Sequence, residues 1–110
     1  MKFSYTTAVS TIALIAGLAN IGHAQPYPSK VVRLVVASAP GGGSDLVART
    51  LASKLGPSLG QQVIAENRPG AGGRIGAEVV AKAAPDGYTL LVGTSSLMVI
   101  TPRRSPATNY

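Results

Sequence analysis

Hydrophobic positions along the chain alternate between short continuous runs and stripes at helical spacing. The runs predict strands over residues 31–37, 62–66 and 88–92, because continuous apolar segments of this length suit strands covered on both faces. The stripes predict helices from about Ser44 and over residues 74–83. This β-α-β-α-β order predicts an α/β fold with parallel strands and right-handed crossovers. If the first strand is central, the strand order is 2-1-3.

The helices are predicted from their apolar faces and their terminating residues. The apolar stripe of the first comprises Val47, Ala48, Leu51, Ala52 and Leu55. We expect this stripe to pack against the sheet while Arg49 faces solvent. Gly56-Pro57 is expected to end or kink the helix, because proline lacks an amide donor, and Gly60 is a natural stop. The second helix is expected to bury Ile75, Val79, Val80 and Ala83.

A glycine-rich bend follows the first strand. Pro40 ends the strand, and Gly41, Gly42 and Gly43 let the backbone turn sharply and approach a ligand closely. Gly43 or Ser44 can cap the following helix, with Asp45 in its first turn. The amide groups of such a helix start can bind an anion, but the same glycines also suit a tight connection without a ligand. The bend alone leaves both interpretations open.

Further hydrogen-bond donors are expected at the same end of the sheet. Ligands of open α/β sheets bind outside the carboxyl ends of the strands, where the strand order reverses. The loop over residues 67–73 and the segment Thr94–Ser96 follow the second and third strands, so both should lie near the bend. The candidate ligand-binding residues are Ala39, Gly41, Gly42, Gly43, Ser44, Asp45, Asn67, Gly72, Gly73, Thr94, Ser95 and Ser96.

The charged and amide side chains near these loops have competing interpretations. Arg68 and Arg74 could supply positive charge to an anion, although a solvated surface position is the commoner role of such arginines. Asp45 would repel a carboxylate, so we expect it to cap the helix or to bind an amino or hydroxyl group of a ligand. Asn67 is more often a residue that stabilises its own turn than one that contacts ligand.

Composition excludes several kinds of enzyme. The chain has no cysteine, and its one histidine, His23, lies in a segment that we expect to be removed. Ser-His-Asp and Cys-His catalysis are therefore excluded, and the four acidic residues are too dispersed for a metal site. The glycine bend lacks the spacing and the lysine of a P-loop, and residues 70–76 miss the dinucleotide fingerprint by one position. We predict no enzymatic activity, no cofactor and no metal.

The chain is basic, with a formal net charge of +6. Such a charge favours anionic ligands or surfaces. The basic residues are scattered singly and the aromatic residues are few, so we predict no nucleic-acid binding. A small secreted module that binds polyanionic surfaces is the alternative to a binding site for small anions.

The first 24 residues have the pattern of a secretory signal peptide. Lys2 precedes an apolar run, and small residues at Gly22 and Ala24 predict cleavage after Ala24. The alternative is a membrane anchor, for which the apolar run is short. The pattern favours the signal peptide and therefore export to the periplasm.

Three motifs in a fixed order resemble the Bug family, the extracytoplasmic solute-binding receptors of tripartite tricarboxylate transporters. They are Pro40-Gly41-Gly42-Gly43-Ser44-Asp45 with Ala48-Arg49, then Glu66-Asn67-Arg68-Pro69-Gly70-Ala71-Gly72-Gly73, and then Ala84-Pro85-Asp86-Gly87-Tyr88-Thr89-Leu90-Leu91 with Gly93-Thr94. The resemblance implies a type II periplasmic-binding-protein fold, in which two α/β lobes close on a small carboxylate. The implied ligands are dicarboxylates, tricarboxylates, amino acids or aromatic acids, and the implied partners are membrane permease subunits.

The resemblance covers only part of a receptor. We expect residues 25–100 to form the N-terminal part of lobe one, with the second lobe absent. Residues 101–110 do not resemble the family continuation and are expected to form a disordered tail. A frameshift or premature stop in a receptor gene is our hypothesis for this ending.

Overall fold

The computed structural model describes residues 24–105, 108 and 110. Apart from Ala24, the predicted signal peptide lies outside the described residues, as does His23. The strands are β1 (Val32–Val36), β2 (Val63–Asn67) and β3 (Thr89–Val92). The helical elements are α2 (Gly43–Leu59), η1 (Ala71–Gly73), α3 (Arg74–Ala81), η2 (Ser96–Ile100) and α4 (Thr101–Arg104). None of the helices in the described residues is long and apolar enough to cross a membrane.

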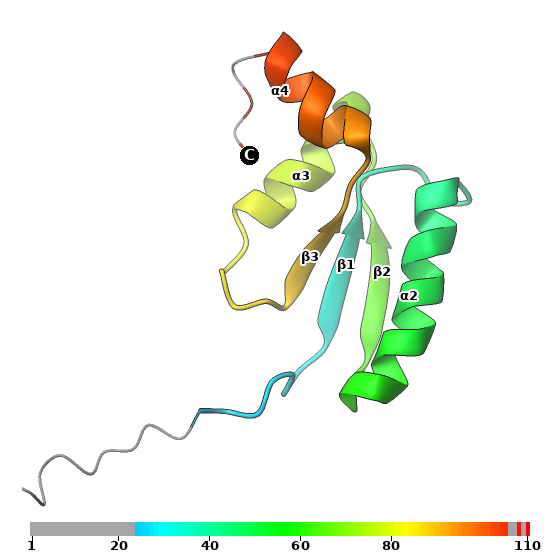
Figure 1. Ribbon diagram of the computed structural model, residues 1–110, viewed down its shortest axis with the longest axis vertical. Helices are drawn as coiled ribbons and strands as arrows, with labels where there is room; N and C mark the ends of the chain where they lie inside the picture. The colour runs from blue at the N-terminus through cyan, green and yellow to red at the C-terminus, as the bar shows by residue number, and fades with distance from the viewer. Residues whose placement is uncertain (1–23, 106–107, 109) are drawn as a thin grey trace, which may run out of the picture.

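The sheet has β1 at its centre, in the order β2-β1-β3, and all its pairings are parallel (Figure 1). Val36 at the end of β1 pairs with Asn67 on β2 and with Val92 on β3. The predicted α/β fold and strand order are therefore confirmed. Because the strands are parallel and in this register, their carboxyl ends meet at one edge.

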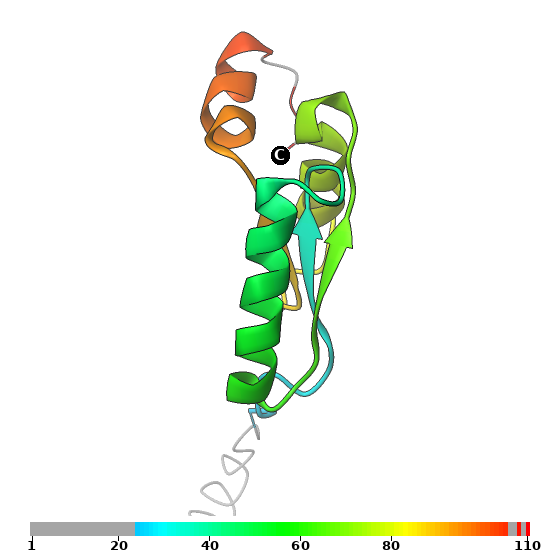
Figure 2. The same cartoon turned by 90° about the vertical axis from the view of Figure 1, so that its right-hand side faces the viewer.

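The two crossover helices cover opposite faces of the sheet. α2 packs against β1 and β2, whereas α3 packs against β1 and β3 (Figures 1 and 2). The two crossovers leave the sheet centre in opposite directions, and right-handed connections then place their helices on opposite faces. The core beneath α2 contains Val32, Leu34 and Val63, with Ala52, Tyr88 and Val92 packed against it.

Helix α2 continues beyond the predicted break at Gly56-Pro57. It ends at Leu59, and Gly60 follows in the left-handed conformation with φ 66°. The expectation that Gly56-Pro57 ends the helix was wrong, whereas the predicted stop at Gly60 is confirmed. Pro57 lies in the last turn, where its missing amide costs one hydrogen bond and leaves the rest of the helix intact.

The predicted apolar stripe of α2 is only partly buried. Ala48 is fully buried and Ala52 packs against the core, but Val47 remains 54% exposed and Leu51 44% exposed. The expectation that the whole stripe packs on the sheet was wrong. Small side chains face the sheet and allow a close approach, so the larger ones of the stripe are left outside the contact.

Helix α3 is shorter than predicted, and the face that it buries most deeply differs from the predicted one. It ends at Ala81, and its fully buried residues are Gly76 and Ala77. Ile75, expected in the core, is 49% exposed. A Cβ atom at Gly76 would lie 3.0 Å from Cα of Ala37, so the smallest residue of α3 marks its closest approach to the sheet.

The segment after β3 is helical through Arg104. In η2 the amide and the Oγ1 of Thr101 both donate to the carbonyl of Ser96, which is a wide turn, and α4 continues from there. Tyr110 donates from its hydroxyl to the carbonyl of Leu97 at 3.3 Å. The expectation of a disordered tail is therefore wrong for residues 101–104, because a helix already started at Ser96 extends through Pro102.

Candidate functional site

The glycine bend links the carboxyl end of β1 to the start of α2. Gly42 caps α2 in an extended conformation (φ −81°, ψ 171°), so the helix begins at Gly43. We predicted Gly43 or Ser44 as the cap. The cap is instead Gly42, and it makes no side-chain hydrogen bond to the helix. Gly41 has φ 85°, a conformation that glycine adopts without strain.

Asp45 lies behind the bend, with only 4% of its surface exposed. Its Oδ2 accepts hydrogen bonds from the amide of Gly41 at 2.9 Å and from Nε of Arg49 at 3.0 Å. Its Oδ1 accepts from Nδ2 of Asn67 at 2.9 Å. The Arg49 bond, then those from Gly41 and Asn67, lower the pKa of Asp45 from 3.8 to about 2. Asp45 therefore stays ionised, and its oxygens bind the protein's own donors, whereas we expected it to cap α2 or to bind an amino or hydroxyl group of a ligand.

Asn67 connects the end of β2 to the bend. Its Nδ2 also donates to the carbonyl of Ser38 at 3.2 Å, and its Oδ1 accepts from Nη2 of Arg49 at 3.1 Å. We expected Asn67 to stabilise its own turn. Its side chain instead joins β2 to the end of β1 and to α2.

The second glycine-rich loop packs against the end of β1. Gly73 is buried with φ 92°. A Cβ atom there would lie 3.1 Å from the carbonyl oxygen of Ala37 and 3.2 Å from Cδ2 of Leu97. Gly73, at the end of this loop, therefore lies between the end of β1 and the η2 segment. Gly72 is exposed on this loop.

The third candidate segment begins η2. Oγ1 of Thr94 accepts a hydrogen bond from the amide of Leu97 at 3.3 Å, and the Thr94 carbonyl accepts from Met98 at 3.1 Å. Thr94 thus bonds the first turn of η2, while Ser95 and Ser96 are exposed beside it. Leu97 is 1% exposed and packs near Gly73, which brings this segment to the same edge as the second loop.

The predicted residues divide into an accessible set and a supporting set. The accessible set comprises Ala39, Gly41, Gly42, Gly43, Gly72, Thr94, Ser95 and Ser96, with Ser44 partly exposed. Asp45, Gly73 and the amide of Asn67 support the loops from behind. Arg49 was expected to face solvent, and its side chain is 56% exposed, but sequence reasoning missed its bonds to Asp45 and Asn67. Its spacing of four residues from Asp45 on one helix was the available signal.

Arginines of the second loop differ in their pairing. Arg68 pairs with Glu66, which also binds Arg33, and these two arginines, Arg33 first, hold the pKa of Glu66 below its usual range. Arg74 forms no ion pair within the described residues, and its Nε is buried there without a hydrogen-bond partner. Oγ of Ser38 is likewise buried without a partner in that part of the chain.

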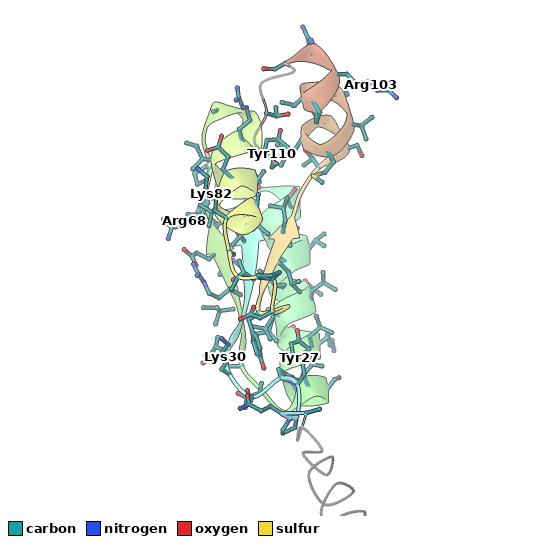
Figure 3. The ribbon with its side chains drawn as sticks, turned by 90° about the vertical axis from the view of Figure 1, so that its left-hand side faces the viewer. Tyr27, Lys30, Arg68, Lys82, Arg103 and Tyr110 are labelled. Carbon is teal, nitrogen blue, oxygen red and sulfur yellow. The ribbon has the colours of Figure 1, made fainter. Side chains whose placement is uncertain are left out.

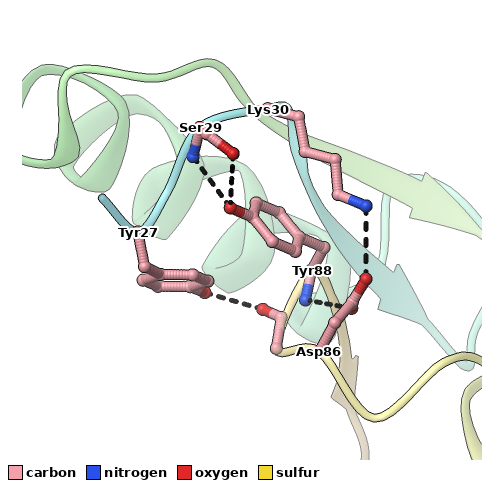
Figure 4. A network of polar contacts seen from close by, with 6 residues as sticks. Tyr27, Ser29, Lys30, Asp86 and Tyr88 are labelled. Carbon is pink, nitrogen blue, oxygen red and sulfur yellow. Dashed lines mark hydrogen bonds and ion pairs between the residues drawn. The ribbon is translucent and has the colours of Figure 1, made fainter. Parts of the chain in front are cut away.

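The opposite end of the molecule carries a separate polar cluster. Tyr27 donates to the carbonyl of Gly87 at 2.7 Å, the amide of Ser29 donates to the Tyr88 hydroxyl at 2.8 Å, and Lys30 pairs with Asp86 at 3.2 Å (Figure 4). Tyr27 and Lys30 lie far from Arg103 and Tyr110 along the long axis (Figure 3). These contacts fasten the segment before β1 to the turn before β3 and belong to the framework.

Two other features bear on the chemistry of the site. A groove of about 370 Å³ between α2 and β2 is lined by Arg49, Ala52, Val63, Ile64 and Ala65. Among the described residues, no three His, Cys, Asp or Glu side chains form a group that could hold a metal ion. The accessible chemistry at the sheet edge therefore consists of backbone amides, hydroxyls and arginine.

A parallel sheet with glycine-rich loops at its carboxyl ends is typical of the α/β lobes of small-molecule binding proteins. The family model for the tripartite tricarboxylate transporter family receptor matches residues 47–110. The chain belongs to this receptor family. The match includes residues 101–110, which we expected to lie outside the family pattern.

Curated relatives agree with this assignment. A UPF0065 protein of Bordetella pertussis is 43% identical over 100 residues, covering 91% of this chain and 31% of its own length. The protein BugT of the same organism is 49% identical over 81 residues, covering 74% of this chain and 25% of its own. The chain thus spans between a quarter and a third of these relatives.

Solved structures show the same fold. A periplasmic transporter matches with a TM-score of 0.73 and 46% identity, covering 76% of this chain and 28% of its own. A Rhodopseudomonas palustris protein, MatC, was solved with bound malate and matches with a TM-score of 0.57 and 46% identity over 59% of this chain and 22% of its own. An R. palustris protein with adipate matches with a TM-score of 0.63 and 41% identity over 64% of this chain and 24% of its own. The family is one of solute-binding receptors and is not a class of enzymes.

Proposed function

We propose that this chain supplies the first-lobe side of an extracytoplasmic receptor for small carboxylates. The observation that carries the proposal is the meeting of three donor-bearing loops at the carboxyl edge of one parallel sheet. The carboxylate of Asp45, behind the bend, is already bonded to the protein's own donors. Donors of this kind suit an anion, and similar proteins are known with malate and with adipate.

The proposed contacts come from the accessible set. The amides of Gly42 and Gly43 lie at the start of α2, which is the positive end of the helix dipole and favours an anion. The hydroxyls of Ser44, Ser95 and Ser96 add neutral donors. Arg74, at the start of α3, forms no ion pair within the described residues. We therefore propose that its positive charge attracts the anionic ligand at long range.

The proposed mechanism is binding without chemical conversion. A carboxylate bound at this edge would be enclosed by a second lobe in the longer relatives and delivered to membrane permease subunits. We place this step in the periplasm, in keeping with the predicted cleavage after Ala24 and with the periplasmic structures that this chain resembles. The ligand class is a dicarboxylate, tricarboxylate, amino acid or aromatic acid.

Titration of the 110-residue chain with malate and with adipate tests the proposal. We expect the amide resonances of Gly42, Gly43 and Ser95 to shift in NMR spectra, with affinity in the millimolar range because one lobe covers only part of a ligand. Adipamide, which has the same length without the charges, is expected to cause no shift. Gly43→Ala places a methyl group in open space at the helix start, so it should weaken binding without disturbing the fold.

Ser53→Ala on the outer surface of α2 is the matched control and is expected to bind like the wild type. Shifts at the three loops that persist at higher salt support the proposal. Shifts scattered over the basic side chains that vanish with salt, together with strong binding to heparin, would instead establish the polyanion-binding alternative.

A further inference from the structure

Three side chains join four separate segments behind the glycine bend. Asp45 binds the amide of Gly41, Asn67 binds the carbonyl of Ser38, and Arg49 binds both Asp45 and Asn67. The end of β1, the bend, α2 and the end of β2 are thereby connected. The three side chains form a closed triangle, because Asp45 also accepts from Asn67, and Arg49 is the member that donates to both of the others.

The geometry uses the particular shape of arginine. Nε of Arg49 donates to Oδ2 of Asp45 at 3.0 Å, while Nη2 donates to Oδ1 of Asn67 at 3.1 Å. A guanidinium carries these donors on one rigid plane, so it can hold two acceptors at a set separation. Lysine has a single ammonium group on a flexible stem and cannot reproduce this fork.

The bridge also has an electrostatic consequence. Asp45 lies in the first turn of α2, behind the bend where a carboxylate ligand is proposed to bind, and two like charges at close range would repel each other. Arg49 is the charged residue bonded to Asp45; its other partners there are the Asn67 amide and the Gly41 backbone amide. The arginine therefore offsets the charge of Asp45 at the place where an anion approaches.

We propose that Arg49 is a positioning residue, which fixes the glycine bend against the loop that starts at Asn67 and offsets the charge of Asp45. Arg49 itself need not touch the ligand. Its effect on carboxylate binding rests on the proposed function, whereas its effect on the loops can be measured without any ligand.

The ligand-free test compares Arg49→Met with Lys54→Met in the 110-residue chain. Lys54 is an exposed cation on the same helix, so this variant removes the same charge elsewhere. For Arg49→Met we expect the pKa of Asp45, followed by NMR of its carboxyl carbon, to rise from about 2 toward 3.8. We also expect hydrogen exchange of the Gly41 amide to accelerate about tenfold or more, because Asp45, its hydrogen-bond acceptor, loses the bond from Arg49.

Arg49→Lys separates charge from geometry. We expect it to keep the pKa of Asp45 low but to lose the bond to Oδ1 of Asn67. The Asn67 side-chain amide resonances should therefore shift, although Nδ2 keeps its bonds to Ser38 and Asp45. If Arg49→Met fails to fold, Arg49→Lys still tests the positioning role. An unchanged Gly41 exchange rate and unchanged Asn67 resonances in Arg49→Lys would overturn the positioning role.

The ligand test then asks whether the positioning matters for binding. We expect Arg49→Met to weaken malate binding about tenfold, with Arg49→Lys recovering part of the loss and Lys54→Met unchanged. Equal malate affinity in the wild type and in Arg49→Met would overturn the link to the ligand. If the wild type itself does not respond to malate or adipate, the proposed function fails, and the ligand-free measurements still decide whether Arg49 holds the two loops.

Discussion

Small residues determine how closely the helices approach the sheet. At Gly76, a Cβ atom would lie 3.0 Å from Cα of Ala37 and 3.0 Å from the carbonyl oxygen of Arg68. Both neighbours are backbone atoms, which cannot rotate away as a flexible side chain can. At Gly43, by contrast, a Cβ atom would meet nothing within 4 Å. The two positions therefore respond differently to the same added methyl group.

We predict that Gly76→Ala lowers the free energy of unfolding by about 1–3 kcal/mol, because it overpacks the contact between α3 and the residues that directly follow β1 and β2. Gly43→Ala should raise it by about 0.4–1 kcal/mol, because it restricts the unfolded chain without straining the folded one. Urea unfolding of both variants measures the difference. Equal stability of the two would show that α3 can move away from β1 at little cost.

At the level of elements, α2 shows how a helix tolerates a proline near its end. The Pro57 ring removes the amide that would bind the carbonyl of Ser53, four residues earlier. The helix still reaches Leu59 and ends at Gly60 in the left-handed conformation. Packing of Ala48 and Ala52 on the sheet holds the helix in place, so one missing bond does not end it.

We expect Pro57→Ala to increase the free energy of unfolding by about 1 kcal/mol, because alanine restores the missing bond and is the better helix former. Pro69→Ala, in the exposed turn after β2, should decrease it by about 0.5 kcal/mol, because it only adds freedom to the unfolded chain. Opposite signs in urea unfolding are the expected result. A loss of stability in both variants would contradict this explanation of α2.

At the scale of the whole molecule, the exposed apolar side chains affect whether copies of the chain associate. Leu46 is 69% exposed, Val47 54%, Leu51 44% and, on β3, Leu90 42%. Exposed apolar side chains that lie together favour association. The net charge of +6 opposes it, but this repulsion is screened by salt.

We therefore predict that the 110-residue chain self-associates, and more strongly as salt is added. The double variant Val47→Lys, Leu51→Lys should shift it toward monomer in sedimentation equilibrium. Thr50→Lys with Ser53→Lys adds the same charge on the polar side of α2 and serves as the control. If the control dissociates the chain equally well, net charge and not the apolar stripe governs association.

Local pattern in the sequence was enough for the order of elements and for the class of fold. Continuous apolar runs, glycine stops and turn residues act over a few neighbouring positions, so β1, β2, β3 and α3 could be predicted to within one or two residues. The parallel order followed from the helical crossovers, and the three motifs pointed to the receptor family that the comparisons then established.

Tertiary structure decided what local pattern could not. Which face of α2 packs depends on how closely small residues approach the sheet, so Ala48 is buried while Leu51 is exposed. The role of Arg49 depends on Asn67, a residue on another element that only folding brings within 3.1 Å. By itself the sequence determined the elements and their order; contacts between residues far apart along the chain determined which side chains support the loops and which remain accessible to a ligand.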